Sequence, residues 1–494
     1  MTAFTRRTAL GALATPFAAS LARAMQSNNG RPKNVLLIMS DQHKPDALGA
    51  SGNRVARTPN LDAFAGTATN FSNCYCSNPV CTPSRASLLT GLYTHNHGAL
   101  NNITPWPFEH KTMAHMFSGA GYMSSLIGKM HFVDAQTHGF DYHVDFNEWY
   151  QFLGPKTKLY ADELGHPNSG SGLPQVDDFW RDFGDPWKDA RETDGRRGQV
   201  SVGRISKIPE EEHFDAFVAR ESVRFLKEHS RKQPFFLITS FLRPHDPFMP
   251  SARFAEMFRP EDMKLPPTWG KVNLDTVPKE IRASIEHNRP TPEVDDPEVA
   301  KRHIAYYYAN LAEMDWNAGK VLNALRELNL EDDTIVIYTS DHGEMLGEHK
   351  LWQKFVFYES SVRIPLLMRV PGLPRGRRNS TIVSNVDIAP TLGELCGLRA
   401  PNVPDGKSFV ADLRNPEQTR DTRVFSEYNL GRPAAKYMIR EGQWKYCYYT
   451  HDIAELYDLK ADPQEMRNLA TLPEFKSKGE ELKGRIFAWY RPPE

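Results

Sequence analysis

Apolar residues gather in five short, nearly unbroken runs that are spread along the 494-residue chain. The runs cover residues 34–39, 122–127, 235–241, 334–339 and 364–369. Most are rich in β-branched or aromatic residues and are short for helices that pack in a core. Runs that are apolar on both faces are typical of strands in a parallel sheet that is covered on both sides. The sequence therefore predicts five buried parallel strands.

Helical patterns lie between these runs. Thr58 and Pro59 look like an N-cap residue followed by a proline at the first helical position, which predicts a helix that continues through Phe64. Between residues 298 and 330, apolar residues recur at helical spacing. Because strands alternate with helices, the predicted fold class is α/β, with a large, mostly parallel sheet flanked by helices on both faces.

Two long stretches interrupt this alternation. Residues 148–207 are rich in Gly, Asp, Trp and Arg, and residues 263–297 are rich in Pro and charge. We expect both to be surface insertions that shape the mouth of an active site. After Cys396 the chain changes character, with antiparallel strands predicted over 424–428 and 436–449 and a final helix over 475–489. We expect a catalytic α/β domain over 31–395 and a smaller α+β subdomain over 396–494.

The first 24 residues have the pattern of an export signal. Arg6 and Arg7 precede an apolar run over residues 9–21, and Ala-Arg-Ala over 22–24 is suited to cleavage. The paired arginines favour twin-arginine export over a general secretory signal with incidental arginines, so we expect a periplasmic or secreted protein. We expect no membrane anchor, because the run is shorter than the about 20 residues needed to span a bilayer. The formal net charge of -1 argues against a nucleic-acid partner.

Metal-binding side chains follow two of the predicted strands. Asp41 and Gln42 come after the first run, and Asp341 and His342 come after the fourth. In open α/β sheets ligands bind beyond the carboxyl ends of the strands, so these residues are expected to share one edge. Carboxylate and amide oxygens suit Ca²⁺, and an imidazole also admits Mn²⁺ or Zn²⁺. Taken alone, the Asp-His pair would more simply be a salt bridge or a capped turn.

Cationic side chains occupy comparable positions. Lys129 and His131 follow the second run, His245 follows the third, and Lys354 lies beyond the fourth. Around a metal, such groups would neutralise an anion with several oxygens and protonate a leaving alkoxide. Each of them alone would be an ordinary surface residue. Their convergence on one sheet edge predicts a site for an anionic substrate.

Cys81 is the most distinctive residue. It precedes Arg85 and a predicted helical segment over residues 86–89, with Pro83 near the helix start. A cysteine at a helix N-terminus beside an arginine has a lowered pKa and is reactive. The other cysteines are Cys74, Cys76, Cys396 and Cys447, and an odd number leaves at least one thiol unpaired or modified in an exported protein. A buried structural thiol or a disulfide to Cys74 or Cys76 explains Cys81 equally well, whereas the spacing of a zinc finger is missing.

The segment from Cys81 to Arg85 has the pattern Cys-x-Pro-x-Arg, which resembles the signature of the sulfatase family in the alkaline phosphatase superfamily. Further matching segments occur in the family's order over almost the whole mature chain, at residues 58–62, 86–91, 128–131, 340–343 and 455–459. The resemblance implies a hydrolase of sulfate monoesters. It also implies that a formylglycine-generating enzyme oxidises Cys81 to formylglycine, whose hydrated aldehyde attacks sulfur with one hydroxyl. The second hydroxyl then loses its proton, so that the aldehyde reforms and sulfate leaves.

The same resemblance implies a role for each candidate residue. Asp41, Gln42, Asp341 and His342 hold a divalent metal together with modified Cys81. Arg85 and Lys129 steady the nucleophile and the charge of the sulfate, and His131 is the base that releases sulfate. His245 and Lys354 contact the sulfate and the leaving oxygen as general acids.

Two positions depart from the common sulfatase pattern. Many sulfatases have a second aspartate where Gln42 stands and an asparagine where His342 stands, and the pattern here is nearer to the choline-sulfatase and phosphonate monoester hydrolase branch. With one carboxylate fewer, Ca²⁺ remains the expected metal and Mn²⁺ becomes an alternative. The same residues could cleave phosphonate monoesters or phosphodiesters, which also carry one negative charge on a tetrahedral centre. If the site were unmodified, the chain would instead be a secreted protein that binds sulfated glycans.

The expected substrate is a sulfated small molecule or carbohydrate. Aromatic residues in the first insertion could stack on a sugar or bind a quaternary ammonium group; they are Trp149, Tyr150, Trp180 and Trp187. Packing of the insertion onto the domain explains these residues at least as well.

Overall fold

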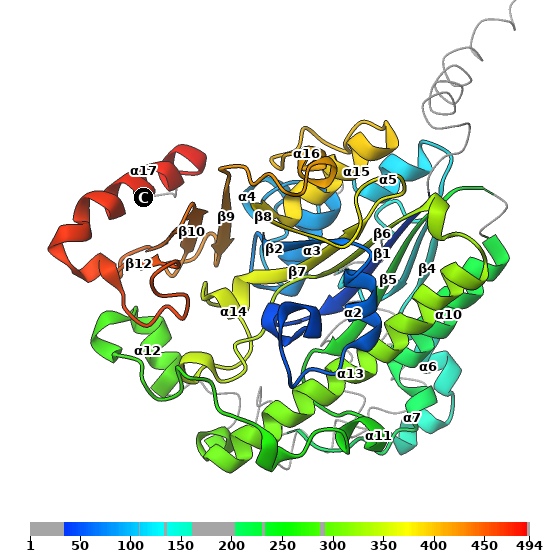
Figure 1. Cartoon of the computed structure of the whole chain (residues 1–494), viewed down its shortest axis with the longest axis horizontal. Coiled ribbons are helices and arrows are strands. Elements are labelled where there is room, and N and C mark those ends of the chain that lie inside the picture. The colour runs from blue at the N-terminus through cyan, green and yellow to red at the C-terminus, as the bar shows by residue number, and fades with distance from the viewer. Residues whose placement is uncertain are drawn as a thin grey trace, which may run out of the picture.

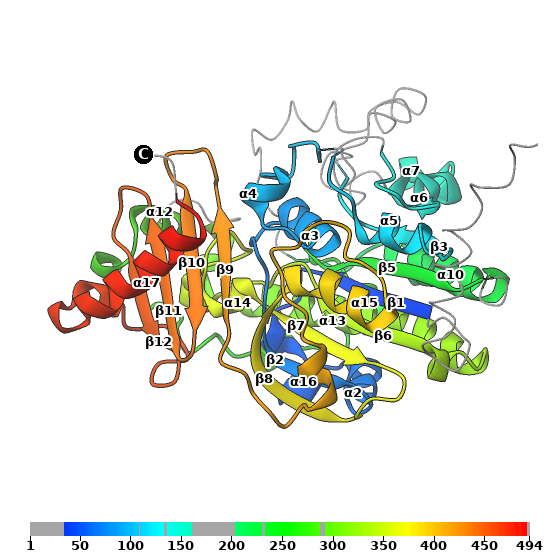
Figure 2. The ribbon, with the colours of Figure 1, turned by 90° about the horizontal axis from the view of Figure 1, so that it is seen from above.

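The computed structural model describes residues 34–107, 109–132, 136–160, 203–229, 233–286 and 292–491. The predicted export signal lies outside these residues, as do Trp180 and Trp187. Figures 1 and 2 show a large α/β body and a smaller layer of strands and helix at the C-terminal end of the chain. The α/β class and the smaller C-terminal subdomain are therefore confirmed, whereas the exact boundary between residues 395 and 396 stays a prediction.

An eight-stranded sheet with the order β4-β3-β5-β1-β6-β7-β2-β8 forms the centre of the large body. Its strands are β1 (Asn34–Asp41), β2 (Thr69–Tyr75), β3 (Met123–Gly128), β4 (Tyr142–Val144), β5 (Phe235–Pro244), β6 (Thr334–Ser340), β7 (Arg363–Arg369) and β8 (Arg377–Ser384). Strand β1 is central and pairs in parallel with β5 on one side and β6 on the other. The ends of these three strands are thereby placed next to one another.

The prediction that residues 364–369 form a parallel strand is wrong, because β7 pairs antiparallel with both β6 and β2. Between β6 and β7 the chain contains only short helical turns, including α14 (Glu359–Val362). A parallel return needs a crossover long enough to carry the chain back to the start of the sheet. Without one, β7 runs back from the edge at which β6 ends.

The sequence patterns missed β2, β4 and β8. These strands lie towards the two edges of the sheet. Strand β2 mixes buried positions with partly exposed ones, β8 begins with two exposed arginines, and β4 has only three residues. None of them is an unbroken apolar run, which is the pattern that identified the central strands.

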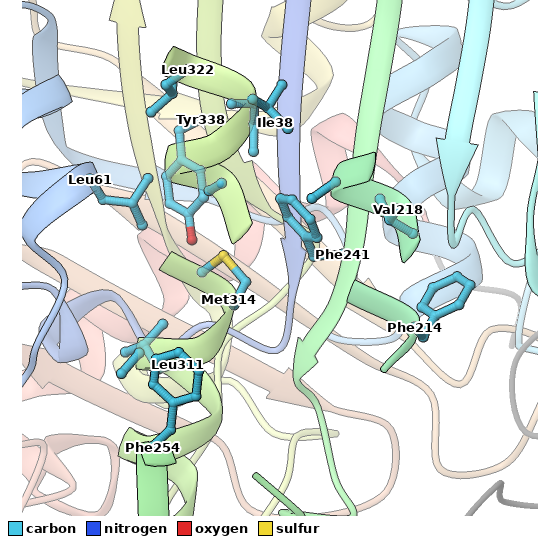
Figure 3. Close-up of a cluster of buried hydrophobic side chains, with 14 of the residues drawn as sticks. Ile38, Leu61, Phe214, Val218, Phe241, Phe254, Leu311, Met314, Leu322 and Tyr338 are labelled. Carbon is cyan, nitrogen blue, oxygen red and sulfur yellow. The ribbon is translucent and has the colours of Figure 1, made fainter. Parts of the chain in front are cut away.

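Helices cover both faces of the sheet, as predicted. Leu36 and Ile38 of β1 pack on one face in a core that includes residues of α2 (Pro59–Ala65), α10 (Phe214–His229) and α13 (Pro297–Glu327). Figure 3 shows part of this core, with Ile38 near Leu322 and Tyr338. Val35, Leu37 and Met39 face the opposite core, which includes residues of α3 (Cys81–Thr90), α5 (Met113–Ser118) and α15 (Ile388–Cys396). Further short helices of the large body include α4 (Thr94–His97), α11 (Ala252–Ala255) and α16 (Val410–Arg414).

The predicted helices α2 and α13 are both present. Helix α2 begins at Pro59, but the Thr58 side chain does not cap it as predicted. Its Oγ1 accepts a hydrogen bond from the Gly49 amide and donates one to Asp62. Helix α13 is capped by Asp296, whose carboxylate accepts hydrogen bonds from the amides of Glu298 and Val299.

The two insertions differ in their relation to the core. The described part of the first insertion includes most of α6 (Phe146–Leu153) and all of α7 (Lys156–Leu159). Trp149 and Tyr150 of α6 are buried in the same core as Leu36. Packing therefore accounts for these two aromatic residues, and the expectation of a surface insertion is wrong for this part. The second insertion contributes α12 (Lys279–Glu286), which lies beside the C-terminal subdomain (Figure 1).

The C-terminal subdomain is a four-stranded antiparallel sheet with one long helix. The strands are β9 (Arg423–Tyr428), β10 (Lys436–Glu441), β11 (Trp444–Tyr449) and β12 (Glu455–Asp458), in the order β12-β11-β10-β9. Helix α17 (Lys476–Trp489) buries Leu482 and Ile486 in a small core with Tyr437 and Leu456 of this sheet. Across the described ranges, no helix has the length and apolar character needed to cross a membrane.

Candidate active site

Arg85 joins the two aspartates that follow β1 and β6. Its Nη2 donates to Asp41 at 2.9 Å and its Nε donates to Asp341 at 2.8 Å, and all three side chains are fully buried. The remaining nitrogen, Nη1, donates to the carbonyl oxygen of Lys129 and to the Ser240 hydroxyl. All three guanidinium nitrogens thus have partners within the protein, so Arg85 orients the two carboxylates.

Four potential metal ligands converge at this point. The ligand atoms of Asp41, Cys81, Asp341 and His342 all lie within 4.8 Å of one another, and all four residues are buried. The Nδ1 of His342 lies 3.0 Å from the carbonyl oxygen of Gly343, to which it can only donate. In the neutral ring, Nε2 therefore presents a lone pair toward Cys81 Sγ, 3.3 Å away.

An unsatisfied oxygen supports a cation at this position. Asp41 Oδ1 is buried and has no hydrogen-bond partner among the described residues. It lies 3.9 Å from His342 Nε2. A buried carboxylate oxygen without a partner is costly unless a cation neutralises it. Together with the imidazole lone pair it is a donor set that suits a divalent ion, so the residues present fit the metal that the resemblance implies.

Gln42 directs its amide oxygen toward Lys354, whose ammonium lies near Cys81. The amide nitrogen donates to Asp246 at 3.0 Å and also to Glu344, which leaves Oε1 to accept from Lys354 Nζ at 2.6 Å. The sequence analysis did not assign Asp246 or Glu344 a role. A signal was present, because both stand in the strand-end segments that carry His245 and His342. The role of Gln42 as a metal ligand stays a prediction, since its nearest partner at the amide oxygen is Lys354.

Cys81 is the first residue of α3, and its sulfur faces the cluster. Besides His342, Sγ lies 3.6 Å from Lys354 Nζ. Burial would raise the pKa of the thiol, but the charges of Lys354 and Lys129 outweigh it and hold that pKa well below its usual range. Cys74, Cys76 and Cys81 all lie in the described part of the chain and none of them is in a disulfide there, so a disulfide from Cys81 to Cys74 or Cys76 is excluded.

Lys129 and His131 line another side of the cluster. Lys129 Nζ lies 2.7 Å from Asp41 Oδ2. His131 is buried and interacts with Cys81. Burial lowers the pKa of His131, although the Cys81 side chain acts in the opposite direction. A histidine that is neutral near pH 7 can accept a proton, as a base must.

Lys354 and His245 complete the site. Lys354 Nζ is 2.8 Å from His245 Nε2, and the backbone on either side of Lys354 is left-handed, with φ of 66° at Gln353 and 79° at Phe355. Burial lowers the pKa of Lys354, but the charges of Cys81, Asp41 and Asp246 outweigh it and raise that pKa. Lys354 is therefore an ammonium group at neutral pH. All ten predicted site residues lie in one cluster, in which nine are buried and His245 is partly exposed.

A family model described as sulfatase matches residues 33–398, which is more than half of the chain. The chain belongs to the sulfatase family. A second model, described as N-sulphoglucosamine sulphohydrolase, C-terminal, matches residues 347–490. The resemblance seen in the sequence is thereby confirmed, and the chain is a sulfuric ester hydrolase.

The similarity between this sulfatase and known proteins extends over nearly its whole length. A choline-sulfatase of Rhizobium meliloti (strain 1021) is 32% identical over 458 residues, covering 90% of this chain and 83% of its own. An arylsulfatase of Clostridium perfringens (strain 13 / Type A) is 30% identical over 465 residues, covering 91% and 92%. The solved phosphonate monoester hydrolase of Agrobacterium radiobacter is 26% identical with a TM-score of 0.77, covering 93% of this chain and 95% of its own.

Proposed function

We propose that this sulfatase hydrolyses a sulfate monoester to an alcohol and inorganic sulfate, with formylglycine made from Cys81 as the nucleophile. The observation that carries the proposal is the convergence of Cys81 Sγ, the His342 lone pair and the unpartnered oxygen of Asp41. The similarity to a choline-sulfatase and an arylsulfatase supports the reaction class. The hydrated aldehyde of formylglycine supplies one hydroxyl for attack on sulfur and a second whose loss of a proton releases sulfate.

Asp41, Gln42, Asp341 and His342, with the modified residue 81, would hold the divalent metal. The proposed ion is Ca²⁺, with Mn²⁺ as the alternative because the donors include an imidazole and only two carboxylates. When bound, the metal supplies positive charge for the sulfate oxygens and polarises the nucleophile. Arg85 keeps both carboxylates turned toward that position through its two hydrogen bonds.

Cations and histidines around Cys81 supply the remaining chemistry. Lys129 and Lys354 neutralise charge on the sulfate oxygens, which is the largest single contribution in many hydrolases. Lys354 donates a proton to the leaving oxygen, assisted by His245 at 2.8 Å. His131, whose pKa is lowered by burial, is the base that takes the proton when sulfate leaves.

Maturation and export belong to the same proposal. A formylglycine-generating enzyme would read the segment from Cys81 to Arg85, and residues 1–24 would direct twin-arginine export to the periplasm or beyond. That route carries folded proteins, so oxidation of Cys81 and metal loading can be completed before translocation.

A second candidate activity is hydrolysis of phosphonate monoesters or phosphodiesters. It is favoured by the similarity to a solved phosphonate monoester hydrolase and by Gln42, which leaves one carboxylate fewer around the metal position than in many sulfatases. With one acid fewer at the site, the same cations can neutralise either a sulfate ester or a phosphonate monoester or phosphodiester.

The deciding experiment uses the full chain expressed with a formylglycine-generating enzyme. Mass spectrometry of the Cys81 peptide establishes the modification, and parallel assays compare aryl sulfate with aryl phosphonate after loading with Ca²⁺ or Mn²⁺. We expect formylglycine at position 81 and a higher kcat/KM for the sulfate. A strong preference for the phosphonate would favour the second candidate, whereas a persistent thiol with glycan binding and no turnover would favour a binding protein.

A further inference from the structure

A pocket of about 430 Å³ lies where Lys354, helix α12 and the C-terminal subdomain meet. Helix α12 contributes Ile281 and Ser284, and the subdomain contributes Tyr428 and Lys436. This volume is within the range of roughly 300–1,000 Å³ that is common for small-molecule sites. Three segments that are distant in sequence thus enclose a space large enough for one ring-sized group.

Lys354 connects this pocket to the candidate active site. Its Nζ is 3.6 Å from Cys81 Sγ, and the same residue lines the pocket. The ring centroid of Phe355 lies 5.9 Å from that Nζ. An ester whose sulfate lies at Cys81 would therefore extend its alcohol past Lys354 and onto Phe355.

Phe355 has two features that are unusual for a structural residue. Its side chain is 36% exposed although it is large and apolar, and its φ of 79° is one that side chains other than glycine rarely adopt. Strained backbone is retained mainly where function requires it. The ring of Tyr428 stands 6.0 Å away, so the two aromatic residues line one part of the pocket. Phe355 is placed to stack on a ring.

The charges of the pocket are already paired. Glu280 is the one acid among the lining residues, and its carboxylate forms an ion pair with Lys436. The Lys436 ammonium also lies 4.8 Å from the centroid of the Tyr428 ring. Binding of a quaternary ammonium group requires a carboxylate or an aromatic face that is open to it. Here Lys436 occupies both the Glu280 carboxylate and the Tyr428 ring. The Phe355 ring remains open, but the Lys354 ammonium lies 5.9 Å from its centroid and repels a second cation there.

We propose that this pocket receives the alcohol of the ester as an uncharged ring stacked on Phe355, and that the Lys436–Glu280 pair excludes alcohols with a quaternary ammonium group. The proposal rests on the proposed sulfatase reaction. It names Phe355 and Lys436 as residues that determine specificity.

The first test measures kcat/KM of the matured, metal-loaded full chain with phenyl sulfate, glucose 6-sulfate and choline sulfate. Differences in intrinsic reactivity cancel when each variant is compared with the wild type on the same substrate. We expect Phe355→Leu to lower kcat/KM for the two ring esters about tenfold more than for choline sulfate, because an aromatic stack is lost. Trp316→Leu, at an exposed aromatic residue of α13 outside the pocket lining, serves as the matched control and should change no ratio.

The second test removes the blocking ammonium. Lys436→Met leaves the Glu280 carboxylate and the Tyr428 ring open, so kcat/KM for choline sulfate should rise at least tenfold relative to the ring esters. The double variant Lys436→Met with Glu280→Gln should lose most of that gain. Melting temperatures establish whether the variants fold. If the variants at buried Lys436 do not fold, the Phe355→Leu variant, at an exposed residue, still tests the proposal.

The outcomes separate the two proposals. Equal losses for ring esters and choline sulfate in Phe355→Leu, or an unchanged preference in folded Lys436→Met, would overturn the specificity proposal while the sulfatase reaction stands. If wild-type enzyme with formylglycine at position 81 cleaves none of the three esters, the proposed reaction fails and the specificity proposal fails with it.

Discussion

Lys354 Nζ lies 2.8 Å from Nε2 of His245, and Nδ1 of the same histidine lies 2.5 Å from the carbonyl oxygen of Asp246. Because a carbonyl oxygen can only accept, Nδ1 carries the proton of the neutral imidazole and Nε2 accepts from the ammonium. Of the two predicted general acids, Lys354 therefore holds the proton that faces Cys81. His245 positions that ammonium by accepting its hydrogen bond at Nε2.

Replacing Lys354 with Met should slow esters of poorly acidic alcohols most. We expect kcat to fall about 10²- to 10⁴-fold for an alkyl sulfate and much less for 4-nitrophenyl sulfate, whose leaving group needs little protonation. Stopped assays over a series of alkyl and aryl sulfates measure how strongly kcat depends on the pKa of the leaving alcohol. Lys301→Met, at an ion-paired lysine on the surface of α13, is the control. Equal losses across the series would show that Lys354 acts through charge alone.

Replacing Arg85 with Lys should uncouple the two aspartates. A single ammonium group cannot reproduce the two hydrogen bonds to Asp41 and Asp341, so the carboxylates lose their common orientation. We expect kcat to fall at least about 100-fold and metal affinity to weaken. Since Arg85 also lies in the segment expected to direct maturation, the formylglycine content of each preparation must be determined and activity expressed per modified chain. Normal activity per modified chain would contradict this role.

Replacing Asp246 with Asn or Glu344 with Gln should disturb the orientation of Gln42. Each carboxylate accepts a hydrogen bond from the amide nitrogen of Gln42 and so keeps its oxygen toward Lys354. Neutral amides can donate as well as accept, which permits the Gln42 amide to rotate. We expect losses of about 10- to 100-fold in activity or metal affinity. Asp332→Asn, at an exposed aspartate paired with Arg375, should leave both unchanged.

Removal of the metal should destabilise the protein. Without a cation the buried Asp41 oxygen has no partner among the described residues. We expect chelation to abolish activity and lower the melting temperature, and Ca²⁺ or Mn²⁺ to restore both; a ligand at 100 times its Kd contributes about 2.7 kcal/mol. Asp41→Asn should respond little to either ion. A melting temperature that is identical with and without metal would argue against a site at Asp41.

Acid should destabilise the fold through buried neutral histidines, among them His97. Burial lowers the pKa of His97 from 6.5 to about 3, with smaller effects from His110 and His95. Its Nδ1 accepts a hydrogen bond from the Ala99 amide, a bond that protonation would break. The folded pKa lies below the unfolded one, so this stabilisation is present above about pH 6.5 and is lost as the pH falls toward 3, by at most about 1.4 kcal/mol per pH unit.

The measurement is the free energy of unfolding in urea between pH 7 and pH 4.5. His97→Gln, whose amide can keep hydrogen bonds to Ala99 and Ser87 without titrating, should show a shallower decline than the wild type. Parallel curves for the two proteins would show that His97 does not contribute to the pH dependence.

Central strands and site motifs were predictable because their residues have only one good environment. The run over residues 34–39 is apolar on both faces and could only be buried, and the polar residues that follow each such run had to lie at the sheet edge. The direction of β7 was not predictable, because an apolar run does not indicate whether its strand is parallel or antiparallel to its neighbours. Likewise Trp149 and Tyr150 looked like possible ligand contacts, and only the packing of α6 placed them in the core.

By itself the sequence determined the family and the α/β class and named ten candidate site residues, since these depend on residue types in a fixed order. Tertiary structure alone decided which of them touch. Arg85 bridges two aspartates, Gln42 is turned by Asp246 and Glu344, and Lys354 rather than His245 carries the proton near Cys81. Those facts depend on distances of a few ångströms between residues up to about 300 positions apart, and local sequence carries no information on such distances.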